Sequence, residues 1–336
     1  MRSARRRRPG GEAGLTLVEL MISLLIMSIA VTATLALGYS MSNAYTTHRR
    51  MIVVERSARV SLEVLSEAVR GASPSVPTAR IEDLVGCSAY GGLRVTNSTS
   101  QPDQLEVVYA SGGVFTSLRA TYGDGDDFMT VLDGSAFAVG DQVLVSDFAQ
   151  GHLVEITAIA QVGAVWQLTT GAPSTKCSGL QIAFPGGGYP TGALVLRGQV
   201  SRFYVDTLMA GGAPTLMMDP DSDGPADPEP LSEGVDDLQI AIGVDMDGDG
   251  TVLDDGTTTD EWFYNNPGDS DPPLPTITPP RAYRITVIAR SITESSTEAD
   301  AFRPGAEDRS IATTPDVYRR RLLSTTVEIR NLDGSP

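Results

Sequence analysis

One long apolar run dominates the hydrophobic pattern at the N-terminal end of the chain. No charged residue occurs from Leu20 through Thr47, and no proline occurs from Leu15 to about Gly71. The pattern therefore predicts one helix, about 85 Å long at 1.5 Å per residue. Its first half, to about Tyr45, is apolar on all sides, which is typical of a helix surrounded by lipid or protein. We expect residues 15–48 to span a membrane or to lie in the core of an assembly.

The second half of the predicted helix, residues 49–72, alternates apolar and charged positions with helical spacing. We assign the apolar stripe to Ile52, Val60, Val64 and Ala68. The charged residues mostly off this stripe are Arg56, Arg59, Glu63 and Glu67. An amphipathic helix of this kind is expected to pack on a sheet, and Pro74 and Pro77 end it.

Short strand-like runs follow at turn-punctuated spacing. A loop is predicted from Ala72 to Gly92, and strands are predicted at 105–109, 128–132, 142–146, 153–160 and 165–169. We interpret residues 73–185 as a β-rich insertion, because Pro185 and the three glycines after it indicate a boundary.

Longer strands are predicted in the last part of the chain, residues 186–336. They cover 193–206, 238–244, 283–291 and 318–330. Their alternation favours an antiparallel sheet with one face on the helix and the other toward solvent. The predicted fold class is therefore α+β, a long N-terminal helix packed on a β-sheet head with acidic loops.

The chain is strongly acidic. Its 336 residues carry a formal net charge of −17, and no Lys or Arg occurs between Phe203 and Pro280. A chain with this much negative charge is a poor match for nucleic-acid binding, which requires neutralisation of the phosphates. We therefore expect no nucleic acid bound by this chain alone. The acidic segment would repel itself unless cations or disorder relieved the repulsion.

Catalytic chemistry finds little support in the sequence, which favours a protein that is not an enzyme. The two histidines are His48, interpreted as an interfacial anchor beside Arg49, and His152, interpreted as a surface residue. No nucleophile elbow, phosphate-binding loop or zinc spacing occurs. The run Arg319–Arg321 is interpreted as a solvated strand edge, or as a docking point for an acidic partner or the acidic segment of this chain.

A single acid, Glu19, interrupts the start of the apolar segment, and a basic stretch precedes it. The basic residues are Arg2, Arg5, Arg6, Arg7 and Arg8. A carboxylate in hydrocarbon costs at least about 2.5 kcal/mol, so an acid at this place indicates a functional site. The basic leader, the small residue Gly14 and the acid five residues later resemble the prepilin processing signal of type IV pilins and type II secretion pseudopilins.

This resemblance implies specific roles for three residues. A prepilin peptidase would cut between Gly14 and Leu15, remove the leader 1–14 and methylate the new amine of Leu15. Glu19 would then pair with the positively charged N-terminus of a neighbouring subunit. The family most often begins its mature chain with Phe or Met, so Leu15 is a departure. The alternative is a plain signal anchor, which a basic N-terminus and an apolar run also satisfy. The mature chain would hold 20 basic and 41 acidic residues, a net charge of −21.

A narrower resemblance is carried by three later stretches. The run from Leu231 to Gly250, the ending from Tyr318 to Asn331 and the helical stretch from Ala58 to Arg70 look like PilW-type minor pilins. The resemblance implies a minor pilin that primes and caps a type IV pilus and that presents a tip adhesin. The close alternative is a J-type minor pseudopilin of a type II secretion system. A third class is a membrane-anchored secreted enzyme or lectin with a calcium site.

The same resemblance implies partners and a location. The partners would be other minor and major pilins, the prepilin peptidase, the inner membrane and a tip adhesin. The chain would cross the inner membrane once, with a periplasmic head before assembly and an extracellular place at the pilus tip afterwards.

Cys87 and Cys177 are the two cysteines of the chain. Because the head is expected to leave the cytoplasm, a disulfide between them is the preferred interpretation. Two buried free thiols are the alternative. No C-x-x-C redox or zinc motif occurs.

Two acidic clusters lie in the segment without basic residues, and both suggest calcium. The first places carboxylates at alternate positions before Gly250, as in the start of a calcium loop. Its candidate ligands are Asp245, Asp247, Asp249, Thr251 and Asp254. The candidate ligands of the second cluster are Asp219, Asp221, Asp223 and Asp227. The first cluster departs from an EF-hand, because Gly256 stands where a bidentate Glu is expected. The alternative for both is a solvated Asp-Gly turn.

Overall fold

A computed structural model gives the fold, which divides into two compact units, Met1–Ile52 and Val53–Pro336. It describes residues 16–72, 76, 80–90, 92–180, 182–207, 212–221, 227–256, 260–273, 278, 280–294 and 301–328. Gly14, Leu15, Asp223 and the leader 1–14 lie outside the described residues. The predicted processing site is therefore not part of this description.

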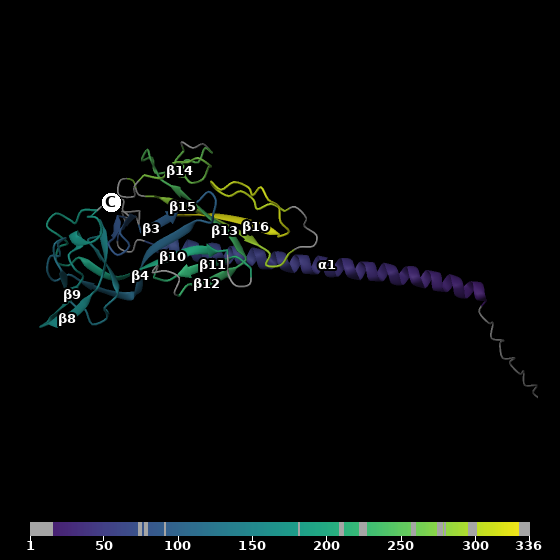
Figure 1. Cartoon of the computed structure of the whole chain (residues 1–336), viewed down its shortest axis with the longest axis horizontal. Helices are drawn as coiled ribbons and strands as arrows, with labels where there is room; N and C mark the ends of the chain where they lie inside the picture. The colour runs from purple at the N-terminus through teal and green to yellow at the C-terminus, as the bar shows by residue number, and fades with distance from the viewer. Residues whose placement is uncertain are drawn as a thin grey trace, which may run out of the picture. The chain divides into compact units, whose positions relative to one another are not determined.

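The predicted long helix is confirmed as α1, Leu17–Arg70, which is 54 residues long (Figure 1). The predicted apolar stripe in its second half is wrong for Ile52 and Val60, whereas Val64 and Ala68 are partly buried against the main core. Ile52 is 66% exposed and Val60 is 39% exposed. The buried positions are Val54, Ala58, Ser61, Leu65, Ser66 and Val69. Steps of three and four residues put these positions on one face. Small Ala and Ser side chains let the helix approach its neighbours closely there.

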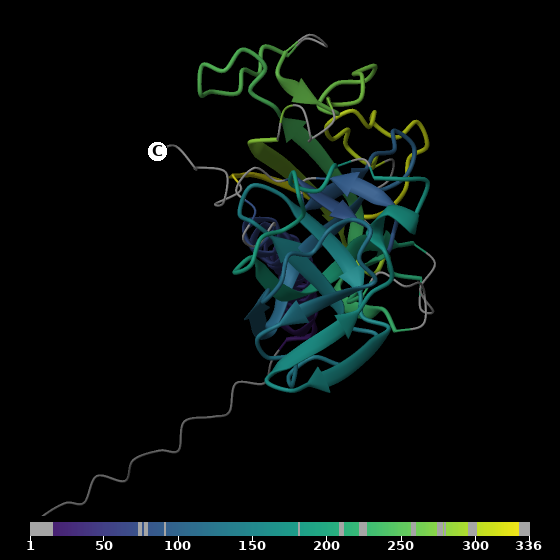
Figure 2. The ribbon, with the colours of Figure 1, turned by 90° about the vertical axis from the view of Figure 1, so that its left-hand side faces the viewer.

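The strands form three sheets. Their bounds are β1 Ile81–Asp83, β2 Ser88–Tyr90, β3 Leu93–Thr96, β4 Gln104–Ser117, β5 Phe128–Val131, β6 Gln142–Ser146, β7 Gly151–Glu155, β8 Ala158–Val162, β9 Val165–Thr169, β10 Leu194–Asp206, β11 Thr215–Asp219, β12 Glu229–Glu233, β13 Val235–Gly243, β14 Trp262–Phe263, β15 Ala282–Arg290 and β16 Arg320–Glu328, with a short 3₁₀ helix at Pro173–Thr175. Figure 2 shows the teal strands of the middle of the chain from their own side.

The largest sheet has nine strands in the order β12-β11-β10-β6-β7-β1-β2, with β4 on the other edge of β10 and β3 beside β4. It is mixed rather than antiparallel, because β1 and β7 run parallel. Strand β10 lies beyond the predicted boundary at residue 185 and pairs with β4 and β6, which lie before it. The strands on the two sides of that boundary therefore share one sheet.

Two strand predictions need correction. The single strand predicted at 153–160 is two strands, β7 and β8, which belong to different sheets. The loop predicted at 72–92 contains β1 and β2. These strands have three residues each, and β1 carries Glu82 and Asp83, so neither has the apolar alternation that indicates a strand. Strands β5, β9 and β8 form a separate three-stranded antiparallel sheet.

The C-terminal sheet has the order β14-β13-β15-β16 and is antiparallel. Three of its strands were predicted, whereas the fourth predicted strand, β10, belongs to the nine-stranded sheet. The prediction of a solvent-facing side is wrong for β13 and β15, because Asp237, Gln239 and Thr286 on that side are also buried. A layer of polar contacts covers this face, as described below.

The main core lies between α1 and the strands. Leu65 and Val69 of the helix share one apolar cluster with residues of β13, β15, β4, β10 and β11. The strand residues in this cluster include Leu105, Val107, Phe203, Leu216, Leu238, Ile240, Ile285 and Val287. A second cluster fills the space between the three-stranded sheet and strands β6 and β7. The amphipathic half of α1 is thus an integral part of the head.

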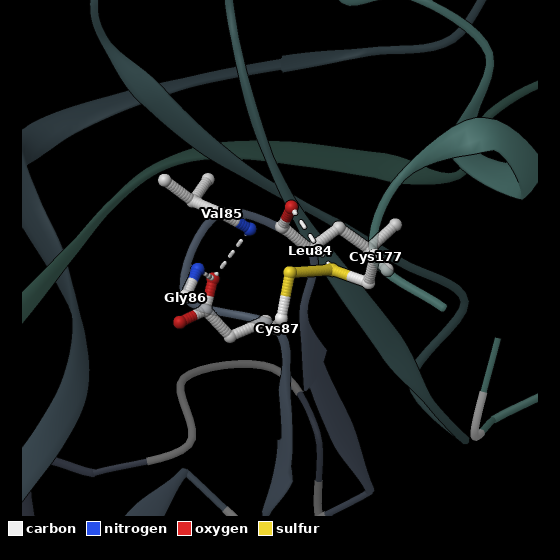
Figure 3. The surroundings of a disulfide bond; sticks show 6 residues. Leu84, Val85, Gly86, Cys87 and Cys177 are labelled. Atoms are coloured by element: carbon white, nitrogen blue, oxygen red, sulfur yellow. Dashed lines mark hydrogen bonds between the residues drawn. A yellow bond between two sulfur atoms is a disulfide. The ribbon is translucent and has the colours of Figure 1, made fainter. Parts of the chain in front are cut away.

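The structure contains the predicted disulfide, Cys87–Cys177, with a Cα–Cα distance of 5.4 Å (Figure 3). Cys87 lies in the turn between β1 and β2, and Cys177 follows the 3₁₀ helix. The Asp83 carboxylate shapes the first of these turns by accepting hydrogen bonds from the Val85 and Gly86 amides at 2.8 and 2.9 Å. The bond joins residues 90 positions apart in sequence.

Candidate functional sites

The first half of α1 presents a continuous apolar surface. Every residue from Thr16 through Thr46 is exposed, and the large side chains include Leu17 at 76% and Leu35 at 69%. Within the described part of the chain, α1 is the one helix that is long and apolar enough to cross a membrane. An exposed apolar surface of this extent indicates a membrane or protein environment.

Glu19 lies in the first turn of α1 and is exposed. Its amide donates a hydrogen bond to Thr16 Oγ1 at 3.3 Å. Thr16 and Glu19 have the spacing of a capping box, in which Thr at the N-cap precedes Glu at the third helical position. Thr16 is a residue that the sequence interpretation missed, although the Thr-x-x-Glu spacing is its signal. The helix cap places the carboxylate of Glu19 at the positive end of the helix dipole.

The first acidic cluster brings three predicted residues together. One carboxylate oxygen from each of Asp245, Asp247 and Asp249 lies within 4.8 Å of the others. Asp254 does not join them, because its carboxylate lies 2.5 Å from Arg284. Thr251 donates to Asp249 through both its amide and its hydroxyl, at 2.7 Å each.

Two further residues organise this loop, and the sequence interpretation missed both. Arg281 binds Asp245 at 2.7 Å, and this hydrogen bond lowers the pKa of the Asp245 carboxyl. Glu261 accepts hydrogen bonds from the amides of Met246 at 2.7 Å and Leu253 at 2.8 Å. The loop is therefore held closed from both sides, and the exposed carboxylates of Asp247 and Asp249 face solvent.

The second cluster brings together Asp219, Asp221 and Asp227, again with one oxygen each within 4.8 Å of the others. Asp219 is buried and binds Arg202 at 2.8 Å. Its fourth predicted member, Asp223, is outside the described residues. In each cluster the most buried aspartate is thus bound to an arginine.

The prediction that His152 is a surface residue is wrong. His152 is fully buried in β7, where Nδ1 lies 2.6 Å from the Tyr189 hydroxyl and Nε2 lies 2.9 Å from the Ile182 carbonyl. Its ring stacks against Phe184 with centroids 4.1 Å apart. The sequence pattern of β7 does not indicate that His152 is buried, because both faces of the strand are buried except at Glu155. His152 is therefore a structural residue of the core, and both of its ring nitrogens have hydrogen-bond partners.

Arginines of the C-terminal part neutralise much of the acidic segment. Arg320 is almost buried and binds Asp236 at 2.7 Å, and it also binds Asp316. Of the interpretations offered for the run Arg319–Arg321, docking to the acidic segment of this chain is correct for Arg320, whereas Arg321 is exposed. The self-repulsion expected from the sequence is relieved here by ion pairs.

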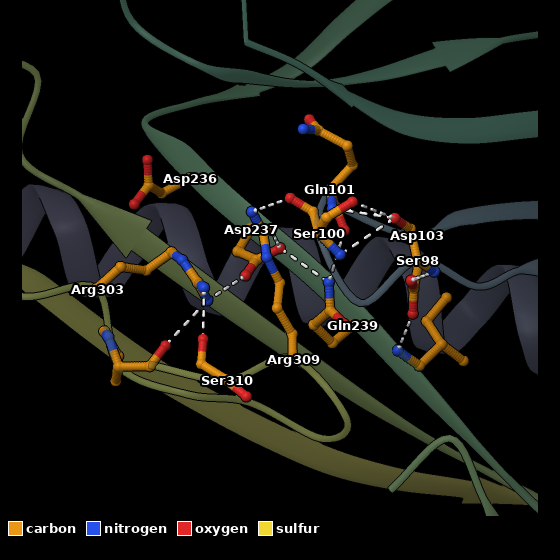
Figure 4. A network of polar contacts seen from close by, with 12 residues as sticks. Ser98, Ser100, Gln101, Asp103, Asp236, Asp237, Gln239, Arg303, Arg309 and Ser310 are labelled. Carbon is orange, nitrogen blue, oxygen red and sulfur yellow. Dashed lines mark hydrogen bonds and ion pairs between the residues drawn. The ribbon is translucent and has the colours of Figure 1, made fainter. Parts of the chain in front are cut away.

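The most buried of these ion pairs centres on Asp237, which is fully buried in β13 (Figure 4). Its carboxylate binds Arg303 at 2.8 Å and Arg309 at 2.5 Å. Arg309 also donates to the Ser100 carbonyl at 2.9 Å, and Arg303 donates to the Ser310 carbonyl at 2.7 Å. These contacts tie the segment from Arg303 to Ser310 and the loop around Ser100 to the outer face of the C-terminal sheet.

The fold and these sites define a class of protein, a β-sheet head carried on a long N-terminal helix whose apolar half is exposed. The sequence model of the type IV pilus-assembly protein W family, PilW, matches residues 202–331 of this chain. The resemblance stated from the sequence is confirmed for these residues. No curated protein sequence matches the chain.

Among solved structures, the chain is similar to a type IV-like pilin from Thermus thermophilus. The two are 10% identical, the similarity covers 83% of this chain and 96% of that chain, and the TM-score is 0.33.

Proposed function

We propose that this chain is a minor pilin, which helps to prime a type IV pilus and caps it. The observation that carries the proposal is the exposed apolar half of α1 with one acid in its first turn, joined to a head in which residues 202–331 match a pilus-assembly family. Such a helix would lie in the inner membrane before assembly and among the helices of other subunits afterwards. The family match favours a pilus over a type II secretion pseudopilus, which the helix alone does not distinguish.

Glu19 would supply the specificity of this assembly. A buried carboxylate is costly unless a positive group pairs with it. The partner would be the amine that peptidase cleavage exposes on Leu15 of the neighbouring subunit. The role proposed for the chain is structural rather than enzymatic, and its partners are other pilins and a tip adhesin presented by the head.

Processing provides the experiment for this proposal. Gly14→Trp should leave an uncleaved precursor that migrates as a slightly larger band in membranes, because a large side chain blocks the small-residue site. Mass spectrometry of the wild-type protein should give an N-terminus at Leu15 with one added methyl group. A mature protein that begins after Gly38 would instead show an ordinary signal peptide and contradict the proposal.

We also propose that the first acidic cluster binds calcium, with Asp247 and Asp249 as exposed ligands and Asp245 shared with Arg281. The support is the convergence of three carboxylates in one closed loop. Since three carboxylates with imperfect geometry suit weak extracellular sites, the dissociation constant should be about 0.1–1 mM. The cluster around Asp219 is the second candidate, and a solvated turn is the alternative for both.

Thermal melts of the full chain in detergent test calcium binding. If the folded state alone binds the ion, 10 mM calcium should stabilise it by about 1.4 kcal/mol or more for a dissociation constant of about 1 mM or less. Asp247→Asn with Asp249→Asn should abolish the rise in the midpoint, whereas Glu67→Gln on the exposed helix face should keep it. If only the double variant Asp221→Asn with Asp227→Asn loses the calcium-dependent rise in the midpoint, the calcium site lies in the second cluster. A wild-type midpoint indifferent to calcium and chelator would contradict both.

A further inference from the structure

Strand β16 forms an open edge of the C-terminal sheet. It pairs with β15 along its whole length in one unbroken register, from Arg290↔Arg320 to Ala282↔Glu328. Among the described residues no strand pairs with its other side. Roughly every second residue of an edge strand directs its amide and carbonyl outward, so this edge offers a row of backbone donors and acceptors.

The usual protection of strand edges is missing along most of β16. Charges occupy its ends, at Arg320, Arg321 and Glu328, whereas the six residues between them contain no charge, proline or glycine. The register with β15 shows no bulge. Proteins normally blunt an exposed edge of this length with such features, because it can pair with another chain.

The other described edges differ from β16. Strand β12 contains Pro230 and a bulge opposite Leu216 and Met217. Strand β2 has three residues, β14 has two, β3 and β5 have four each and β8 has five. With nine residues, β16 is the longest described strand that has one side unpaired along its whole length.

A groove lies beside this edge on the helix side. It has a volume of about 480 Å³ and runs between β16 and the amphipathic half of α1. Its lining residues include Arg59, Leu62, Glu63, Arg70, Leu323 and Thr325. Leu323 is partly buried against the main core, whereas Ser324 on the opposite face binds the Thr286 hydroxyl at 2.8 Å. The odd-numbered side chains in the middle of β16 therefore face the groove.

We propose that β16 accepts an extended strand from a neighbouring, different subunit of the pilus, which adds to the C-terminal sheet beside α1. The open backbone edge selects an extended peptide, and the groove accommodates its alternate side chains. The inference rests on the proposed function, because the groove lies on the same helix whose apolar half would bring the subunits together. An incoming strand with small or apolar side chains over Leu323 and an acidic one near Arg70 would match the groove.

Site-specific photo-crosslinking in cells tests this inference. A photoreactive residue is placed singly at Leu323 or Thr325 in the full chain, and the crosslinked peptides are mapped by mass spectrometry. The expected result is a set of adducts on one segment of another pilus subunit, moving by two residues for each two-residue step along β16. Adducts on scattered positions, or none in assembled filaments, would overturn the inference. Adducts of β16 to β16 of a second copy would overturn the choice of partner.

A pair of variants separates blockage of the groove from a general defect. Thr325→Lys puts a charge into the groove and should remove the crosslinks from Leu323, whereas Thr326→Lys on the other face should keep them. The amount of each variant in membranes and in sheared filaments is measured alongside. If the wild-type chain is absent from filaments, the proposed function fails. If it is present but gives no ordered crosslinks, the strand-addition inference alone fails.

Discussion

At the residue scale, Asp103 shows how burial can set a pH dependence. It is 1% exposed, and its two oxygens accept hydrogen bonds from the amides of Ser98 and Ile240 at 2.8 Å each. Burial raises the pKa of Asp103 to about 8, the two amide hydrogen bonds oppose that rise, and nearby Asp308 and Asp237 add to it. Asp103 therefore binds a proton more tightly in the folded chain than in the unfolded one.

The sign of the effect follows from this difference in proton binding. Where the folded state holds more protons, the free energy of unfolding falls as pH rises. The contribution of Asp103 is fully present below about pH 4, the usual carboxyl pKa, and it is lost as pH rises to about 8. We predict that the free energy of unfolding, measured with urea between pH 5 and 8, declines less with rising pH for Asp103→Asn than for the wild type. The two slopes should differ by up to about 1.4 kcal/mol per pH unit. Parallel curves for the two proteins would contradict this.

The residues missed by the sequence interpretation share one property, which is a partner distant in sequence. Arg281, Glu261 and His152 have roles that depend on which strands meet. The convergence of Asp245, Asp247 and Asp249 was predictable because their alternate spacing is a local feature. Asp254 illustrates the limit, since its spacing fits the loop but Arg284, on β15, holds it elsewhere.

At the scale of elements, the long helix was predictable because its apolar run and lack of proline are local features. The face that it buries was not predicted correctly. Ala58, Ser61 and Ser66 contribute to the buried face, and Ser counts as a polar residue in a hydrophobic pattern. Val60 and Ile52 are apolar residues on the exposed side of the helix, so they shift the predicted stripe away from the buried face. A helix whose packing uses small residues thus has a weak hydrophobic signal.

This correction makes a prediction about two apolar positions of α1. Leu65 is fully buried in the main core, so Leu65→Ala should lower the free energy of unfolding by about 2–5 kcal/mol. Val60 is 39% exposed, so Val60→Ala should change it by about 0.5 kcal/mol or less. Chemical denaturation of the two variants checks this. A larger loss for Val60→Ala would restore the stripe first assigned from the sequence.

At the scale of the whole molecule, the fold class and the disulfide were predictable, whereas the pairing of distant strands was not. A period of two residues identifies a strand and its faces, but it does not name its neighbours. Strand β10 was therefore predicted at the right place and assigned to the wrong sheet. The ion pairs that join residues 236–254 to residues 281–320 depend on the same pairing, since β13 and β15 lie side by side.

The central claim is that the chain enters a pilus through the apolar half of α1 and the carboxylate of Glu19. The most direct measurement is the amount of wild-type and Glu19→Ala protein in membranes and in sheared filaments, by quantitative immunoblotting. Both proteins should be cleaved and present in membranes, because the substitution leaves Gly14 and the apolar run intact. The wild type should be found in filaments, and the variant should be strongly depleted there, because the neighbouring amine loses its partner. Equal incorporation of the two proteins, or absence of the wild type from filaments, would contradict the account.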